Sequence, residues 1–521
     1  MFDRKRKHPF APAPGKPVEP ESGAVTGAYS DEELTNTPVL DFLALNMEKI
    51  GKILGRNADY VARELSLGRS GSIAAELIYF NNLVDMELIE KYLVRPLALD
   101  VYSAGLESGG EIVASLRTGR LLTAGKLKTV KNYRDLLAGI LRGECALLID
   151  GLDEAYLVNT LGFEHRDIEQ PEVEPVVRGP REAFVEVLGV NIALIRRRIH
   201  SPNLVFEQLE LGTVSDTAVC LVYIRGICSD ALADEVRARL LKIRIDGILE
   251  SSYIEELIQD NPHSVFPQIR STERPDSVAA SLLEGRVAVL VDNTPIALVM
   301  PGEFFSLMQS SEDYYDRYWF SSLIRLLRYF AFTLALLLPS LYISIVNFHQ
   351  EMVPSSLMAS IIAARSSVPF PAFLEALAME ITFELLREAG VRLPKPVGQA
   401  VSIVGALVIG QAAVQASIVS PLMVIVVALT GISSFCIPQY GMALPVRVLR
   451  FALMVLAAML GMIGVMIGVL FLMLHLFSLE SFGRPYMAPL APFRAGEWKD
   501  TVLRASWKTL QRRHNGRGGR A

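Results

Sequence analysis

The stretch "RYFAFTLALLLPSLYISIVNF" (Arg328–Phe348) decides the fold class, because no charged residue follows Arg328 within it. A helix of about 20 apolar residues is long enough to cross a bilayer. We therefore predict a first membrane span here. Pro339 lies inside it and should kink the helix or mark a functional bend.

Further apolar stretches follow along the chain and predict more spans. They are Pro396–Val419, Pro421–Ile437 and Phe451–Phe477. In the predicted span Pro396–Val419, Gln411 and Gln415 lie four residues apart on one helix face. Both should point at protein or water because lipid offers no hydrogen-bond partner. The last contains "GVMIG", which is typical of close helix packing but also occurs in spans without a partner helix. Both interpretations stay open.

An acidic stretch, "EALAMEITFELLREAG", separates the first two predicted spans. At 100° per residue its polar side chains fall on two helix faces. One face carries Glu380, Glu384, Arg387 and Glu388. The other carries Glu375 and Thr382, for which we expect a role in packing or gating.

Two hypotheses explain the larger acidic face. The helix could lie in the membrane interface with solvated carboxylates. Alternatively it lines water, and a symmetric ring of copies gathers the carboxylates along a cation path. Since Arg387 can neutralise only one neighbour, we expect some of the carboxylates to need water. The candidate ion path comprises Glu380, Glu384, Glu388, Gln411 and Gln415.

Basic clusters flank the spans and bear on orientation. They are Arg325 with Arg328, Arg387 with Arg392 and Lys395, and Arg447 with Arg450. If the acidic helix crosses the membrane, all of them lie on the cytoplasmic side. If it does not cross, the last two clusters lie outside. We favour five membrane segments with the acidic helix enclosed by protein.

The chain before the spans has the pattern of an α/β protein. Short apolar runs bounded by turn residues predict strands, such as "SIAAELIYF", "CALLIDG", "AYLVNTL" and "TAVCLVYIRGI". "VAVLVDNTPIALVM" predicts a hairpin, and helices are expected from Thr37-Pro38 onward, over "NIALIRRRIHSPNL" and over "ADEVRARLLKI". The expected fold is an α/β cytoplasmic region of two subdomains followed by an all-α polytopic membrane domain. The expected boundaries are 1–30 for a disordered tail, 31–170 and 171–315 for the subdomains, 320–480 for the membrane domain and 481–521 for a basic tail.

Signatures of an enzyme are missing from the sequence. "GRLLTAGKLKT" has the wrong glycine spacing for a P-loop and has Leu127 where a metal-binding hydroxyl should stand. Asp150 and Asp153 suit a strand-end turn better than an acid pair. The four cysteines show no metal or disulfide spacing. The net charge of −5 argues against nucleic acid as a partner. We expect no catalysis, cofactor or metal, and the lack of a signal peptide places the N-terminal region in the cytoplasm.

Longer ordered stretches resemble one family. They are "EPVVRGPREAFVEVLGVNIALIRRRI", "FPQIRSTERPD", "EDYYDRYWFSSLIRLLRY", "LPSLYISIVNFHQEMVPSSL", "VPFPAFLEALAMEITFELLREAGVRLPKPVG" and "PQYGM". Together they resemble the A subunit of GerA-family spore germinant receptors over most of residues 140–480.

The resemblance implies a multi-pass protein of the spore inner membrane that works with B and C subunits. It also implies a homo-oligomer, with five copies suggested, that forms a nutrient-gated channel releasing monovalent cations at the start of germination. Arg178 and Arg181, in the Gly-Pro turn "RGPRE", are our choice for a contact between subdomains or neighbouring subunits, although a plain connecting turn also fits. An accessory stage V sporulation paralogue without nutrient recognition and a secondary transporter are the alternatives.

Overall fold

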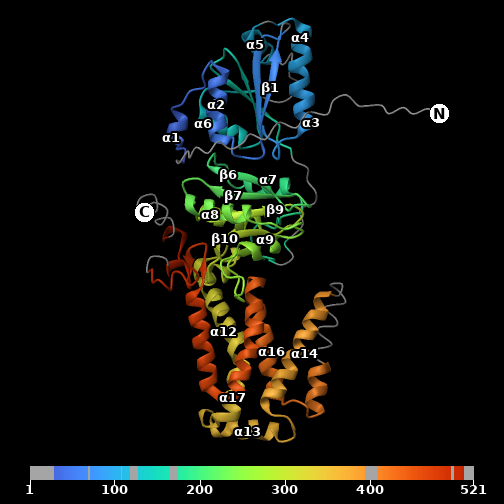
Figure 1. Cartoon of the computed structure of the whole chain (residues 1–521), viewed down its shortest axis with the longest axis vertical. Coiled ribbons are helices and arrows are strands. Elements are labelled where there is room, and N and C mark those ends of the chain that lie inside the picture. The colour runs from blue at the N-terminus through green and yellow to red at the C-terminus, as the bar shows by residue number, and fades with distance from the viewer. Residues whose placement is uncertain are drawn as a thin grey trace, which may run out of the picture. The chain divides into compact units, whose positions relative to one another are not determined.

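The computed structural model describes residues 28–68, 71–106, 108–117, 127–162, 171, 174–392, 408–494 and 498–509. The chain forms two compact units. The first comprises residues 1–80, 89–140 and 144–159, and the second comprises 81–88, 141–143 and 160–521. Figure 1 labels their elements.

The first unit contains an antiparallel sheet of order β1-β2-β4-β5-β3. Its strands are β1 (Tyr60–Leu67), β2 (Ile73–Phe80), β3 (Lys128–Val130), β4 (Glu144–Ile149) and β5 (Ala155–Asn159). Its helices are α1 (Asp31–Thr35), α2 (Leu43–Leu54), a helical run from α3 (Met86–Ile89) to α4 (Val101–Ala104), α5 (Gly109–Arg117) and α6 (Tyr133–Ile140). The predicted strands at 72–80, 145–151 and 155–161 are confirmed.

The second unit begins with a sheet of the same connectivity, β6-β7-β9-β10-β8. Its strands are β6 (Leu204–Leu211), β7 (Thr217–Ile224), β8 (Arg270–Thr272), β9 (Val287–Val291) and β10 (Ala297–Met300). Helices α8 (Asp230–Leu241) and α9 (Ser251–Ile258) cover one face. Helices α7 (Leu188–Arg196) and α10 (Pro275–Leu283) cover the other. Burial of both faces explains why β7 and β9 are continuous apolar runs although the sheet is antiparallel.

The two sheets belong to a duplicated fold, which the sequence analysis missed. "VLDFLALN" (Val39–Asn46) and "FVEVLGVN" (Phe184–Asn191) both end in an asparagine that bonds back six residues. The Asn46 amide donates to the Leu40 carbonyl at 2.7 Å and accepts from the Leu40 N–H at 3.0 Å. Asn191 makes the same pair of bonds to Val185, at 2.6 and 2.8 Å.

The two sheets also have corresponding carboxylates. Each one follows the strand that is third in its sheet's order, β4 or β9. Asp150 accepts a hydrogen bond from the first helical N–H of α2, at Leu43, at 3.0 Å. Asp292 accepts one from the first N–H of α7, at Leu188, at 3.1 Å. This contact caps each helix start, so α2 begins at Leu43 and the predicted start at Thr37-Pro38 is wrong. The predicted helix at 191–204 likewise runs instead from 188 to 196.

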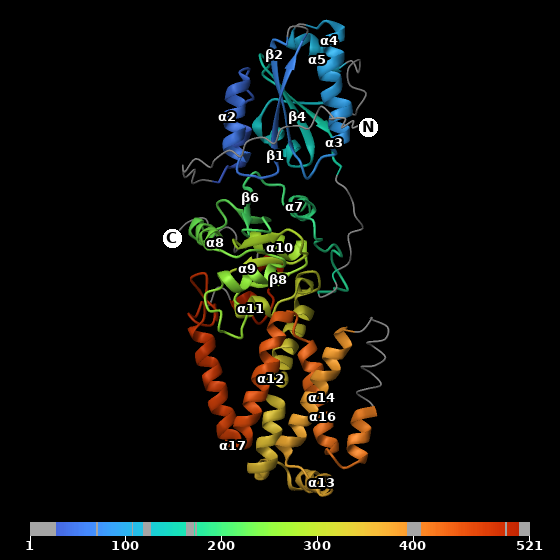
Figure 2. The same ribbon diagram turned by 45° about the vertical axis from the view of Figure 1, so that its right-hand side comes forward.

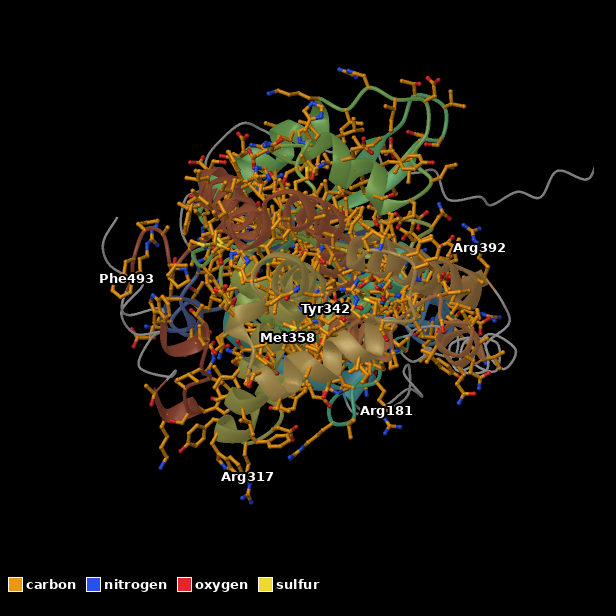
Figure 3. All side chains as sticks on the ribbon, turned by 90° about the horizontal axis from the view of Figure 1, so that it is seen from below. Arg181, Arg317, Tyr342, Met358, Arg392 and Phe493 are labelled. Atoms are coloured by element: carbon orange, nitrogen blue, oxygen red, sulfur yellow. The ribbon has the colours of Figure 1, made fainter. Side chains whose placement is uncertain are left out.

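A bundle of apolar helices follows the second sheet. It contains α12 (Tyr318–Phe348), α13 (Ser355–Arg365), α14 (Ala372–Arg392), α16 (Pro421–Phe435) and α17 (Tyr440–Ser478). Helix α12 packs against α16 and α17, and α14 packs against α16 (Figures 1 and 2). Helix α13 lies across one end of the bundle, where Met358 is buried (Figure 3). Residues 408–415 are helical, and residues 396–407 of the predicted span Pro396–Val419 lie outside the described residues.

Helix α17 is not the single straight span that the sequence suggested for Phe451–Phe477. Its backbone leaves the helical region at Gly461, where φ is 64° and ψ is −141°. A Cβ at Gly468 would lie 2.4 Å from the Leu453 side chain, and one at Gly464 would lie 2.1 Å from the Leu456 carbonyl oxygen. Residues 15 apart on a straight helix would be separated by about 22 Å. Two antiparallel arms therefore meet at Gly461, and "GVMIG" provides their contact.

Both ends of α17 lie against the second sheet's subdomain. Gly441 approaches Pro267, and the His475 ring is 3.0 Å from Ser264 Oγ. The following segment, within the predicted basic tail, is folded where the structure describes it. Tyr486 is fully buried, and Phe482 joins the core of the second sheet.

Candidate ion-path residues in the helical bundle

Among the described residues, α12 and α17 are long and apolar enough to cross a membrane by length and composition. Shorter apolar helices, α13 and α16, accompany them. The acidic helix α14 packs among these helices. Its carboxylates therefore need polar partners in apolar surroundings, and each carboxylate has a different set of partners.

Glu380 lies at the centre of the bundle opposite Arg450 of the first arm of α17. The Arg450 Nη1 is 3.0 Å from Glu380 Oε2, and both side chains are at most 1% exposed. Neither Glu380 oxygen, nor Nε and Nη1 of Arg450, has a hydrogen bond in the part of the chain described. The two charges thus compensate each other, but the atoms are not aligned for a hydrogen bond. Much of the free-energy cost of removing both groups from water therefore remains.

Glu384 lies one turn further along α14, between two arginines. Arg447 Nη1 is 2.5 Å from one carboxylate oxygen, and Arg387 Nη1 is 3.5 Å from the other. Arg387 also donates to Ser434 Oγ of α16 at 2.7 Å. The Glu384 side chain remains 35% exposed, so this cluster reaches the surface of the single chain.

Glu375 ties the opposite end of α14 to two neighbouring segments. Its carboxylate lies 3.0 Å from Arg365 at the end of α13 and accepts the backbone N–H of Ser420 at 2.9 Å. Because Glu375 is 1% exposed and fully engaged, the structure gives it a packing contact. Its expected effect on gating stays a prediction.

The other candidate residues have simpler surroundings. Glu388 pairs with Arg392 at 2.6 Å on an exposed surface. Gln411 and Gln415 are exposed on the helical segment 408–415. The Thr382 hydroxyl donates to the Ala378 carbonyl at 2.7 Å, and Pro339 is buried within α12.

These contacts overturn one step of the sequence argument. Arg387 was taken as the only cation able to neutralise the acidic face, whereas α17 supplies Arg447 and Arg450. The inference that Glu380 or Glu384 must face water for lack of a partner is therefore wrong within one chain. The sequence indicated only orientation for Arg447 and Arg450, yet their three-residue spacing matches two adjacent turns of the acidic helix. The ion-path role itself stays a prediction.

The turn that carries Arg178 and Arg181 packs within its own chain. Arg178 lies 3.7 Å from Asp316 and is mostly exposed. Gly179 has a φ of 133°, and a Cβ there would lie 2.6 Å from the Tyr315 ring. Arg181 is exposed and points away from the body of the chain (Figure 3). The subunit contact expected for these arginines stays a prediction.

A buried ionic cluster anchors the start of α12. The Arg325 guanidinium contacts Asp313 at 2.9 Å and Asp500 at 3.0 Å. Arg328 contacts Asp313 at 2.7 Å. The sequence analysis used these arginines only for orientation; here they fasten the C-terminal segment to the first long apolar helix. Among the described residues, no group of three or more His, Cys, Asp or Glu could hold a metal ion.

Comparison with known proteins places the chain in the class of spore germination proteins. The family described as "Bacillus/Clostridium GerA spore germination protein" matches residues 48–515. The chain belongs to this GerA family.

Individual relatives agree with this assignment. Spore germination protein KA of Bacillus subtilis is 45% identical over 90% of this chain and 86% of its own length. A membrane protein of the same organism, YfkQ, is 44% identical over 92% of both chains. The crystal structure of the N-terminal domain of the A subunit of the Bacillus megaterium germinant receptor GerK3 is 34% identical, with a TM-score of 0.41, over 51% of this chain and 98% of that one.

Proposed function

We propose that the chain is the ion-conducting A subunit of a nutrient-gated germinant receptor in the spore inner membrane, where it works with B and C subunits. Its relatives include proteins named as spore germination proteins. The helical bundle is polytopic in this proposal, and the α/β region is cytoplasmic.

The observation that carries the proposal is the incompletely satisfied polar cluster of α14. Glu380 and Arg450 lie together in an apolar bundle without aligned hydrogen bonds. Ionisable groups at membrane depth are costly, and they commonly mark ion pathways. A cluster that is held by charge alone can exchange partners at low cost, which suits a gate.

Exposed polar side chains support a ring of copies. Gln411 and Gln415 are exposed, and Glu384 is one-third exposed on the same apolar bundle. Lipid cannot satisfy these groups, so neighbouring copies or an enclosed water column must do so. A homo-oligomer, with five copies as the family suggests, places these side chains around one axis and offers a path to monovalent cations.

Potassium efflux from liposomes tests the proposal. The purified chain is reconstituted alone, and in parallel with its B and C partners with and without nutrient. Efflux that requires the partners and nutrient supports the receptor function. Efflux from the chain alone, independent of nutrient, favours the accessory channel. Efflux no faster than that of empty liposomes under every condition contradicts a channel.

A further inference from the structure

A polar cavity of about 280 Å³ lies where the second sheet's subdomain meets the ends of α16 and α17. Arg270 of the edge strand β8, Arg274, Glu174 and Ser311 contribute polar groups to its wall. Phe435 and Ile437, at the end of the apolar helix α16, form another part. None of these residues belongs to the candidate ion path.

Arg270 is the unusual member of this cavity. Its Nε is enclosed without a hydrogen-bond partner, and within the described ranges its guanidinium makes no hydrogen bond or ion pair. The neighbouring Arg274, in contrast, pairs with Asp276 at 2.8 Å and donates to the Pro180 carbonyl at 3.0 Å. Arg274 thus has a carboxylate in direct contact, whereas the charge of Glu174 acts on Arg270 without an ion pair within the described ranges.

The carboxylate of Glu174, whose charge acts on Arg270, makes hydrogen bonds to other residues. Glu174 accepts hydrogen bonds from the Thr272 hydroxyl at 2.5 Å and from the Gln439 amide at 2.6 Å. Burial lowers the pKa of Arg270, although the charge of Glu174 opposes this. Burial also raises the pKa of Glu174 against the effect of Arg270. The Arg270 side chain is half-buried, and its Nε is enclosed without a partner. A buried donor without a hydrogen bond is costly, and an anion in the cavity would relieve that cost.

We propose that this cavity binds an oxyanion, a phosphate group, through the guanidinium of Arg270 and the hydroxyl of Ser311. A guanidinium presents parallel donors that match two oxygens of a phosphate. The Ser311 hydroxyl has no hydrogen-bond partner among the described residues. The phosphate has two possible sources: free phosphate, or a lipid headgroup whose acyl chains extend along Phe435 and Ile437.

Thermal unfolding of the full chain in a phosphate-free maltoside detergent tests this site. The melting temperature is followed against sodium phosphate, with sodium chloride at equal ionic strength as reference, and separately against short-chain phosphatidylglycerol. A ligand that binds only the folded state raises the melting temperature with concentration. Protection by phosphate identifies the free ion as sufficient, and protection by the lipid alone identifies the headgroup.

Arg270→Gln should lower the affinity for the protecting ligand roughly tenfold to a hundredfold, as expected for loss of charge-assisted hydrogen bonds. Without ligand it should melt at or above the wild-type temperature, because the unmet charge is gone. Arg244→Gln, an exposed arginine of the same subdomain, should leave protection unchanged. If Arg270→Gln does not fold, Ser311→Ala should still weaken binding roughly twofold to tenfold. Absence of protection, or equal protection of wild type and the Arg270 variant, overturns the proposal.

Discussion

Single residues of the acidic helix differ mainly in how their charge is compensated. Glu375 is buried with an arginine and a backbone N–H, Glu380 is buried with an arginine but poorly aligned, and Glu388 is paired in the open. The same side chain at intervals along one helix thus has three different environments. Among the described residues, the Glu380 environment leaves both carboxylate oxygens and two nitrogens of Arg450 enclosed without hydrogen bonds, and the Glu384 cluster shares this in part.

Substitutions of the Glu380–Arg450 pair should show this coupling. Glu380→Gln or Arg450→Gln alone leaves an uncompensated buried charge and should destabilise the bundle by about 3–5 kcal/mol. The double variant removes both charges and should recover a large part of that loss. The measurement is unfolding of the full chain in detergent, followed as a double-mutant cycle.

The exposed Glu388–Arg392 pair provides the control. Glu388→Gln should change stability by no more than about 1 kcal/mol, because exposed pairs contribute little. If the effects of Glu380→Gln and Arg450→Gln simply add in the double variant, the two side chains do not interact in the folded bundle.

Among the elements, α17 depends on one backbone conformation. The φ of 64° and ψ of −141° at Gly461 are accessible to glycine and strained for other residues. The space there is also filled, since a Cβ would approach the Phe348 side chain at 2.9 Å. The reversal therefore requires glycine on both grounds.

Gly461→Ala should lower the stability of the bundle by at least about 1–3 kcal/mol through backbone strain, with a further cost from the contact with Phe348. Detergent unfolding and the yield of folded protein both report it. Gly410→Ala is the matched control, because among the described residues a Cβ there meets the Val424 side chain alone, at an ordinary 3.7 Å. Equal behaviour of the two variants would show that α17 does not reverse at Gly461.

The sequence predicted elements better than it predicted their connections. The strands predicted at 72–80, 145–151, 155–161 and 217–227 and the hairpin with Asn293 in its turn are confirmed, because apolar runs and turn residues act locally. The strands β1, β3, β6 and β8 were not predicted. The start of α2 was misplaced because its cap, Asp150, comes from 107 residues away. The reversal at Gly461 was missed because its apolar arms form one unbroken hydrophobic stretch. The arginine partners of the acidic helix were missed for the same reason as the cap, because Arg447 and Arg450 come close to Glu384 and Glu380 only after folding.

At the scale of the whole molecule, the structure connects the helical bundle to the second α/β subdomain at several points. Both ends of α17 contact this subdomain, and the Arg325 cluster holds the C-terminal segment there. The last helical arm therefore returns the chain to the side on which the bundle began. The five-segment arrangement that we favoured from the sequence would have placed the C-terminal segment on the opposite side.

Residue labelling from each side of the membrane tests this topology. Single cysteines at exposed Val214 and exposed Leu503, in a chain otherwise free of cysteine, should react with a membrane-impermeant maleimide from the same side. The expected result is labelling of both sites in inside-out vesicles and of neither in right-side-out vesicles. Labelling of the two cysteines from opposite sides would contradict the return of the chain at Gly461.

The reversal potential in asymmetric potassium chloride tests the central claim, that the charged cluster of α14 and α17 faces a cation path. Glu380→Gln with Glu384→Gln should lower cation flux and move the reversal potential toward that of chloride, because Arg447 and Arg450 are left in excess. Arg447→Gln, which removes one of the positive charges beside Glu380 and Glu384, should move it the opposite way. A reversal potential that is unchanged in all of these variants would contradict the account, and the path would then have to lie elsewhere, with Gln411 and Gln415 as the next residues to test.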